Sequence, residues 1–207
     1  MKSAKFLLLL TAPLLFTGVA GAQSVDAYLG FGTVMNSSNG VPTDTFGDGT
    51  IYFPPRMGGT FMKVGGDFMF TPHLGVGVES SFRTAQGGYA GLLYKPTFYD
   101  FNAVYHPLAG NTRRIVPEFQ AGIGGVNLKY YYNQQYCDQF VGCSSSNQFL
   151  ESANHFQVHM MAGVNIFLKG GFFLRPQFDV HYVHDFFQFG SDWSPEYSGV
   201  IGYSFGH

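Results

Sequence analysis

The sequence predicts an all-β fold: an eight-stranded, antiparallel, up-and-down transmembrane β-barrel, preceded by a cleavable signal peptide. Three observations lead to this prediction. Apolar residues recur at every second position through most of the chain, which is the period of a strand with one apolar face. Aromatic residues make up 18% of the 207 residues and charged residues only 12%, a charged share about half that of soluble proteins. After the N-terminus, no run approaches the roughly 18 consecutive apolar residues of a transmembrane helix.

The first 22 residues are typical of a secretory signal peptide. Lys2 and Lys5 precede an apolar run, and the small residues Ala20 and Ala22 provide a cleavage signal. A transmembrane helix is the alternative, but the run is short for a span and a cleavage site follows it. We therefore expect residues 1–22 to be removed and residues 23–207 to form one barrel domain.

The first four predicted strands lie in the N-terminal half. Apolar residues alternate with small or polar ones in 25–33 (VDAYLGFGT), 62–70 (MKVGGDFMF) and 74–83 (LGVGVESSFR). The fourth run is 93–106 (LYKPTFYDFNAVYH), where Pro96 weakens the prediction near the start because proline cannot donate to a sheet.

The last four predicted strands follow the same pattern. They are 115–124 (IVPEFQAGIG), 155–168 (HFQVHMMAGVNIFL), 174–182 (LRPQFDVHY) and 197–205 (YSGVIGYSF). Each of the eight runs is about long enough to cross a bilayer as a tilted strand, and an even number of strands is the rule for bacterial barrels.

The connections alternate in length. Residues 71–73, 107–114 and 169–171 make shorter links, whereas longer links are expected at 36–59, 84–91, 127–154 and 184–196. Outer-membrane barrels place short turns on the periplasmic side and longer loops outside. Tyrosines also gather near the run ends, where aromatic girdles or simple strand propensity would place them: Tyr28, Tyr94, Tyr99, Tyr105, Tyr182, Tyr197 and Tyr203.

A β-protein can span a bilayer only as a closed barrel, because every backbone polar group needs a partner. The apolar face then meets lipid and the other face lines the barrel. An eight-stranded barrel is just wide enough for side chains to fill it, so we predict a plugged interior with an internal polar network of roughly balanced charge. Its predicted members are Lys63, Asp67, Glu79, Arg83, Glu118, His159, Arg175, Asp179 and His181.

Cys137 and Cys143 are the two cysteines of the chain. In an exported protein, a close and even pair predicts one disulfide that closes a loop. The loop also carries several tyrosines, beginning at Tyr130, beside polar residues. It is the best candidate for contacts with an external ligand or surface, although a loop that only stiffens the rim is an equally good interpretation.

These features together resemble the small outer-membrane β-barrel superfamily, of the OmpA transmembrane-domain, OmpX and opacity-protein type. The resemblance implies a location in the outer membrane, contact with outer-membrane lipid, and insertion by the outer-membrane assembly machinery. That machinery reads an aromatic residue at the end of the last strand, so Tyr203 and Phe205 are the predicted assembly signal, although Gly206 and His207 follow them. We expect a monomer.

Some barrels of this size are lipid A deacylases, which use a histidine followed two residues later by a serine or threonine nucleophile. The nearest stretch here is HYVHD (residues 181–185), in which position 183 is valine. We therefore expect no enzymatic activity, no catalytic residues and no cofactor.

His159 and His181 lie directly opposite each other if the hairpin between them turns near Gly170, and opposed Cβ atoms are about 5 Å apart. They could share a metal ion or belong to a hydrogen-bonded pair. We favour the pair and predict no metal site, because the sequence does not specify a further ligand.

The sequence thus favours an outer-membrane barrel that acts in envelope structure, or in surface interaction and adhesion through its loops. The alternatives are a membrane-embedded lipid-modifying enzyme and a narrow pore. The net charge of −2 does not indicate a nucleic-acid partner.

Overall fold

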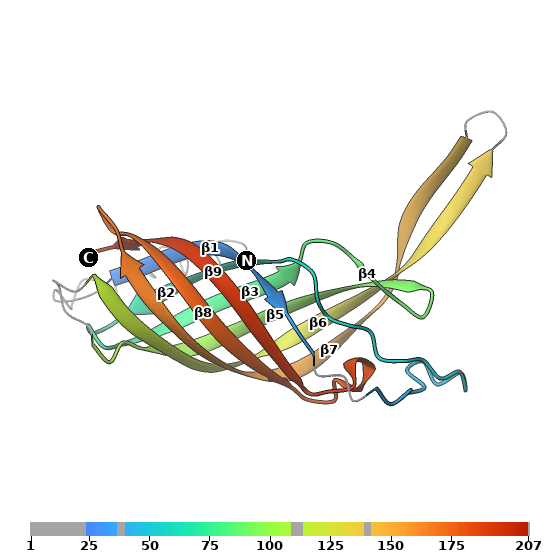
Figure 1. Ribbon diagram of the computed structural model, residues 1–207, viewed down its shortest axis with the longest axis horizontal. Helices are drawn as coiled ribbons and strands as arrows, with labels where there is room; N and C mark the ends of the chain where they lie inside the picture. Colours follow the sequence, from blue (N-terminus) through green and yellow to red (C-terminus); the bar gives the residue numbers. More distant parts are fainter. Residues whose placement is uncertain (1–23, 37–39, 109–113, 139–141, 207) are drawn as a thin grey trace, which may run out of the picture.

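The computed structural model describes residues 24–36, 40–108, 114–138 and 142–206, which form one antiparallel sheet closed into a barrel (Figure 1). Eight strands make the wall: β1 (Ser24–Val34), β2 (Phe61–Met69), β3 (Leu74–Arg83), β5 (Leu92–Tyr105), β6 (Ile115–Asp138), β7 (Gly142–Phe167), β8 (Phe172–Val183) and β9 (Trp193–Phe205). The short β4 (Gly87–Tyr89) pairs with β5, and η2 (Phe187–Phe189) is a 3₁₀ turn. Among these residues no helix has the length and apolar character of a membrane span.

Pairing between the first and last strands closes the barrel. Leu29 lies opposite Ile201 in the β1–β9 ladder, so the predicted closing strand takes the predicted place. Closure leaves no sheet edge with unpaired backbone groups at membrane depth. The eight-stranded antiparallel barrel that the alternation predicts is confirmed.

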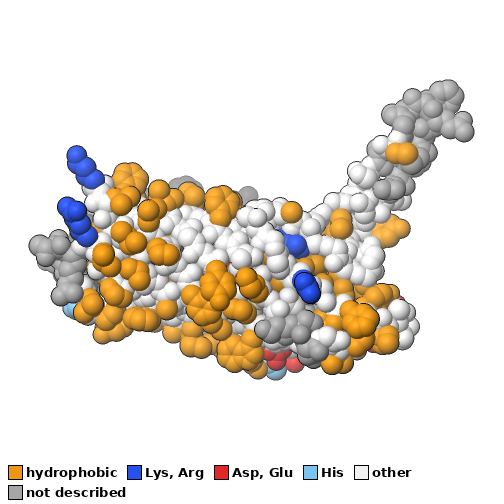
Figure 2. Space-filling model, in the orientation of Figure 1, with side chains coloured by type: hydrophobic (Ala, Val, Ile, Leu, Met, Phe, Trp, Pro, Cys, Tyr) orange, Lys and Arg blue, Asp and Glu red, His pale blue; other side chains and the backbone are white. Residues whose placement is uncertain are grey.

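Side chains alternate between the outside and the inside of the wall. In β8, Leu174 and Phe178 are exposed, whereas Arg175, Gln177 and Asp179 are buried. A soluble barrel would have the opposite arrangement. On the face seen in Figure 2, hydrophobic side chains are spread over the wall, and lysine and arginine side chains project from its left end. Exposed apolar residues occur on every strand of the wall; examples are Leu29, Val64, Val76, Phe101, Ile123, Met160, Leu174 and Ile201.

The short turns and both ends of the described chain lie at one end of the barrel. Ser24 pairs with Met69 and Val25 with Phe205, beside the turn between β2 and β3. The turn between β7 and β8 contains Gly170 and Gly171, both with positive φ (69° and 85°), a conformation that glycine adopts without steric cost. This end corresponds to the periplasmic side of an outer-membrane barrel.

The prediction of a structureless loop over 127–154 is wrong. β6 and β7 are 24 and 26 residues long and stay paired up to Asp138 and Gly142, with one register shift between Tyr130 and Tyr131. They continue beyond the barrel as a two-stranded projection (Figure 1). We call this projection, residues 131–138 and 142–150, the outer arm. Period-two alternation fades there because both faces of the arm meet water, so no face has to be apolar.

Three smaller corrections concern single residues. β9 begins at Trp193 rather than at Tyr197, so Glu196 belongs to a strand and points inward. Tyr28 and Tyr94 are buried inside the barrel and do not join an outer girdle. The period-two pattern already placed Tyr28 on the inner face, and burial there needs only a polar partner for its hydroxyl.

Candidate functional site

Lys63 is the first of two buried cations around which the interior is organised. Its ammonium nitrogen lies 2.7 Å from Glu79 Oε1, 2.9 Å from Asp179 Oδ2 and 3.3 Å from Glu196 Oε1. All four side chains are almost completely buried. Because the acids come from β3, β8 and β9, Lys63 ties opposite parts of the wall together across the interior. Pairing of this kind is what makes buried charge tolerable.

Arg175 is the second buried cation. Its guanidinium lies 3.1 Å from Asp67, forms a closer ion pair with Glu118, and stacks over the ring of Tyr28 at 4.0 Å. The Tyr28 hydroxyl donates to Glu79 Oε2 at 3.1 Å. Since Glu79 also contacts Lys63, Tyr28 and Glu79 join the two cationic centres into one network.

Eight of the nine predicted network residues have buried side chains in the barrel interior: Lys63, Asp67, Glu79, Glu118, His159, Arg175, Asp179 and His181. Arg83 lies apart from them. It is the last residue of β3, is only half-buried, and places its guanidinium 5.1 Å from the centre of the Tyr94 ring. The strand ends there, so its side chain reaches the apolar outer mouth and not the polar interior.

The interior is acidic, and the expectation of balanced charge is wrong. Lys63 and Arg175 are the buried cations among the described residues, against seven buried carboxylates: Asp26, Asp67, Glu79, Asp100, Glu118, Asp179 and Glu196. Histidines accompany several of these acids. His106 Nε2 lies 2.9 Å from Glu118 Oε2, and His181 Nε2 lies 3.2 Å from Glu196 Oε2. The imbalance arises because Asp26, Asp100 and Glu196 add three acids to the predicted network while Arg83 leaves it.

Sequence reasoning missed Glu196 and the neutral amides that complete the network. The predicted loop 184–196 includes Glu196, although Ser194, Glu196 and Ser198 follow the inward alternation of β9. Buried Asn and Gln residues in the strands supply further hydrogen bonds; the amides are Asn102, Gln120, Gln157, Asn165 and Gln177. Extending the alternation through Pro195 would have identified Glu196.

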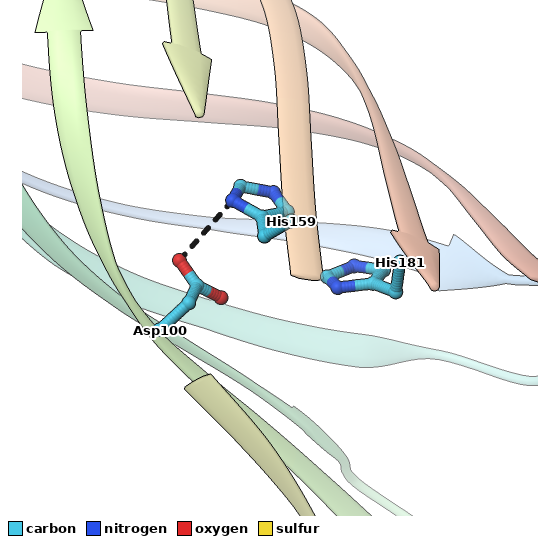
Figure 3. Close-up of side chains that lie close together, drawn as sticks. All are labelled: Asp100, His159 and His181. Carbon is cyan, nitrogen blue, oxygen red and sulfur yellow. Dashed lines mark ion pairs between the residues drawn. The ribbon is translucent and has the colours of Figure 1, made fainter. Parts of the chain in front are cut away.

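His159 on β7 and His181 on β8 are directly opposed in the ladder, as the turn at Gly170 predicts. Their rings stack with centroids 4.9 Å apart and planes 24° apart. Asp100 on β5 faces them, with Oδ1 3.3 Å from His159 Nδ1 (Figure 3). All three side chains are buried, so two histidines and a carboxylate from three strands share one enclosed region.

An apolar cluster fills the outer mouth of the barrel, above this polar region. Phe98 connects the two, because its ring lies 4.7 Å from that of His181 and 6.1 Å from that of Phe61. Residues of the outer loops complete the cluster, which contains Val34, Met57, Phe61, Tyr89, Tyr94, Phe98, Val126, Leu128, Tyr130, Val183, Phe186 and Phe189. We call this the outer plug.

Asn36 holds two of the outer loops in the plug. Its side-chain nitrogen donates to the Phe189 carbonyl at 2.8 Å, and its side-chain oxygen accepts from the Met57 amide at 2.7 Å. The loops are therefore tied down by hydrogen bonds as well as by apolar contact. Sequence reasoning did not foresee the plug, because most of its members lie on several different strands, and only closure of the barrel brings them together with Met57, Phe186 and Phe189 of the outer loops.

The outer arm exposes large apolar side chains to water. Tyr132, Phe149 and Leu150 are 52%, 59% and 58% exposed, and the rings of Tyr131 and Phe149 are in edge contact at 6.0 Å. Near the tip, Cys137 lies directly opposite Cys143 in the ladder. That backbone pairing suits the predicted disulfide, which stays a prediction.

The predicted assembly residues lie at the end of β9. Phe205 is 57% exposed, its ring lies 4.7 Å from that of Tyr203, and Tyr203 in turn contacts Phe172 at 4.9 Å. They form an aromatic patch at the periplasmic end of the wall. Their role in assembly stays a prediction.

Comparisons with known proteins agree with this architecture. No family model and no curated protein matches the sequence. The structure is similar to solved outer-membrane proteins: OprG from Pseudomonas aeruginosa (TM-score 0.60, 13% identity, 89% of this chain and 96% of that chain), a major outer-membrane protein from Thermus thermophilus (0.58, 12%, 89% and 100%), and Neisserial surface protein A (0.55, 12%, 88% and 97%).

Sequence identities this low establish a shared fold but not a shared activity. The surface supplies a second, independent argument, because a closed wall of exposed Leu, Val, Ile and Phe side chains is stable only in lipid. Taken with the fold that the chain shares with solved outer-membrane proteins, this surface identifies it as a small eight-stranded β-barrel with a lipid-facing wall.

Proposed function

We propose that the protein is a closed, non-conducting and non-enzymatic barrel that presents the outer arm for recognition or adhesion at the cell surface. The arm is the observation that carries this proposal. A two-stranded ribbon that extends into water is marginally stable by itself, and exposing Tyr132, Phe149 and Leu150 on it adds a further cost. A contact made by the arm is a functional reason for such exposed apolar side chains.

Two layers of the interior support the non-conducting part of the proposal. The polar network fills the middle of the barrel around Lys63 and Arg175, and the outer plug fills the mouth with buried side chains such as Phe98 and Phe189. A continuous water path would have to cross both layers.

The position of the HYVHD stretch supports the absence of lipid chemistry. His181 is buried and bonded to Glu196 inside the barrel, and Val183 is buried in the outer plug. His184 and Asp185 are exposed and form an ion pair at 3.3 Å. None of these groups combines a serine or threonine nucleophile with a histidine at the lipid face, as deacylation of a membrane lipid would require.

The charge of the outer surface narrows the class of partner. The outer mouth, the outer loops and the arm contain six acids (Asp44, Asp48, Asp138, Glu151, Asp185 and Asp192) and four permanent cations (Arg56, Arg83, Lys95 and Lys129). Such a surface would repel sulfated or phosphorylated polymers. Aromatic side chains beside Asn, Gln and Ser instead suit a neutral glycan or a protein surface.

The test is a shortened arm. Tyr130 and Glu151 are directly paired, so a two-residue Asn-Gly turn can replace residues 131–150, which removes Tyr132, Phe149 and Leu150 and still closes the hairpin. The matched control keeps the full arm and replaces Lys169, an exposed residue of the periplasmic turn, by Met. Cells that display each form would be scored for adhesion to hydrophobic, neutral-glycan-coated and matrix-protein-coated surfaces.

We expect the shortened form to insert normally and to lose adhesion, while the Lys169→Met form keeps it. Equal adhesion by the full-length and shortened forms would refute the recognition role. Two further measurements address the rest of the proposal: steady conductance in planar bilayers would exclude a closed barrel, and an altered lipid A mass on expression would exclude a non-enzymatic one.

A further inference from the structure

The region around Asp100, His159 and His181 has the geometry of a metal-ligand set. One oxygen of Asp100 and one ring nitrogen of each histidine lie within 4.8 Å of one another, and Figure 3 shows the three side chains converging. Asp100 Oδ1 and His159 Nδ1 are already 3.3 Å apart, about the separation of two atoms that ligate one tetrahedral ion at roughly 2.0–2.2 Å each. Each side chain comes from a different strand of a rigid wall.

The hydrogen bonds of the two histidines place a carboxylate at the Nε2 atom of each ring. His159 Nε2 lies 3.1 Å from Asp179 Oδ1, and His181 Nε2 lies 3.2 Å from Glu196 Oε2. At His181, the carboxylate holds the proton on Nε2, which leaves the Nδ1 lone pair free to accept. His159 Nδ1 lies 3.0 Å from Asn102 Oδ1, a contact that a bound metal ion would have to displace. A histidine that ligates a metal almost always donates its other nitrogen to such an acceptor.

Unpartnered buried atoms at the cluster point to a missing ligand. His181 is 1% exposed, and its Nδ1 has no hydrogen-bond partner. Gln157 is fully buried beside Asp100, with its amide nitrogen 3.4 Å from Asp100 Oδ2 and its amide oxygen without a partner. Buried polar atoms are rarely left without a partner, and two of them here adjoin the same cluster.

Charge favours a cation at this place. Within the described residues, the only ion pair of Asp100 is with His159, because Lys63 and Arg175 are engaged by other acids. A buried carboxylate needs a compensating positive charge. The neighbouring set of Glu79, His159 and Asp179 also has ligand spacing, but both of its acids already form ion pairs with the Lys63 ammonium.

We propose that Asp100, His159 and His181 form a binding site for one divalent first-row transition-metal ion, with zinc as the representative ion. The donors would be an Asp100 oxygen and Nδ1 of each histidine, and the unpartnered amide oxygen of Gln157, whose amide nitrogen contacts Asp100, is the candidate for a fourth. Two imidazoles and a carboxylate suit Zn²⁺ and Co²⁺ and disfavour Ca²⁺ and Mg²⁺, which prefer oxygen ligands alone.

The experiment uses the full mature barrel without a polyhistidine tag, folded in detergent and checked by heat-modifiable gel mobility. Equilibrium dialysis against Zn²⁺ measures stoichiometry and affinity, and Co²⁺ absorption reports whether nitrogen ligands surround the ion. The variants are His181→Gln, His159→Gln and Asp100→Asn. The matched control is His106→Gln, which removes another interior histidine paired with a carboxylate, at Glu118, outside the cluster.

We expect one equivalent of Zn²⁺ per barrel, unchanged in His106→Gln and weakened at least tenfold in each of the three variants. Zinc should also raise the urea midpoint of the unchanged protein but not that of the variants. If a histidine variant does not fold, Asp100→Asn and the Co²⁺ spectrum decide the question. Absence of binding, or binding equally strong in all variants, would overturn the proposal.

Discussion

Replacement of Lys63 by methionine is the most direct test of the interior network. Methionine keeps a chain of similar length and removes the positive charge, leaving three buried carboxylates without their shared partner. Two of them keep a second partner, because Asp179 still contacts His159 and Glu196 still contacts His181. Glu79 keeps the Tyr28 hydroxyl, the Gln177 amide at 3.5 Å and an Arg175 nitrogen 3.9 Å away.

The expected loss follows from this geometry. Removing one partner of a buried ion pair costs about 3–5 kcal/mol, which is a large part of a typical stability of about 5–15 kcal/mol. Because Glu79 is left with the most distant cationic partner of the three acids, adding Glu79→Gln to Lys63→Met should restore at least about 1 kcal/mol. The same Glu79→Gln change in the unchanged protein should be destabilising, since it weakens the contact with Lys63.

Urea unfolding in lipid vesicles measures these effects. Trp193 is the only tryptophan and sits at the start of β9 in contact with Tyr182 at 5.0 Å, so its fluorescence reports unfolding of the closing strand. Lys169→Met serves as the control, because Lys169 is exposed at the periplasmic turn. The reasoning fails if the free energy of unfolding of the Lys63→Met form lies within about 1 kcal/mol of that of the unchanged protein. It also fails if Glu79→Gln destabilises the Lys63→Met form further.

Three other predictions concern single contacts. Tyr28→Phe should cost about 1.5–3 kcal/mol in the same assay, because the hydroxyl donates to charged Glu79, whereas a cost near zero would show that the bond does not matter. Gly202→Ala should lower the free energy of unfolding by about 1–3 kcal/mol, since a Cβ there would meet the Phe173 ring. Gly199→Ala should leave it nearly unchanged, because nothing lies within 4 Å of a Cβ at that position. Equal effects of the two changes would contradict this reasoning. Phe205→Ala should slow insertion into the outer membrane in cells without lowering stability in vesicles, as pulse-chase labelling with a heat-modifiability readout would reveal.

The comparison of sequence and structure shows where local patterns suffice. Alternation located all eight strands of the wall and the lipid-facing side of each, because the pleat sends neighbouring side chains to opposite faces. It also located the turn at Gly170 and the opposition of His159 and His181. The same rule failed in the outer arm, where pairing continues but neither face has to be apolar.

The interior needed more than the pattern. Alternation indicated that Lys63 and Asp179 face inward, but they are 116 positions apart in the chain, and only the tilt and stagger of the strands decide that they meet. Arg83 lies at the outer mouth because β3 ends there. Glu196 points into the interior because β9 begins as early as Trp193. Together with the buried Asp26 and Asp100, those two placements make the interior acidic and not balanced.

The sequence by itself therefore determined the class of fold, the membrane-facing surface and the identity of most inward residues, because these depend on the two-residue period of a strand and on the solvent that each face meets. The tertiary structure decided which inward residues touch, how the outer plug closes the mouth, and that Asp100 stands beside the stacked pair of His159 and His181. Contacts of that kind join strands far apart in the chain, so their partners are set by closure of the barrel and not by any local run of residues.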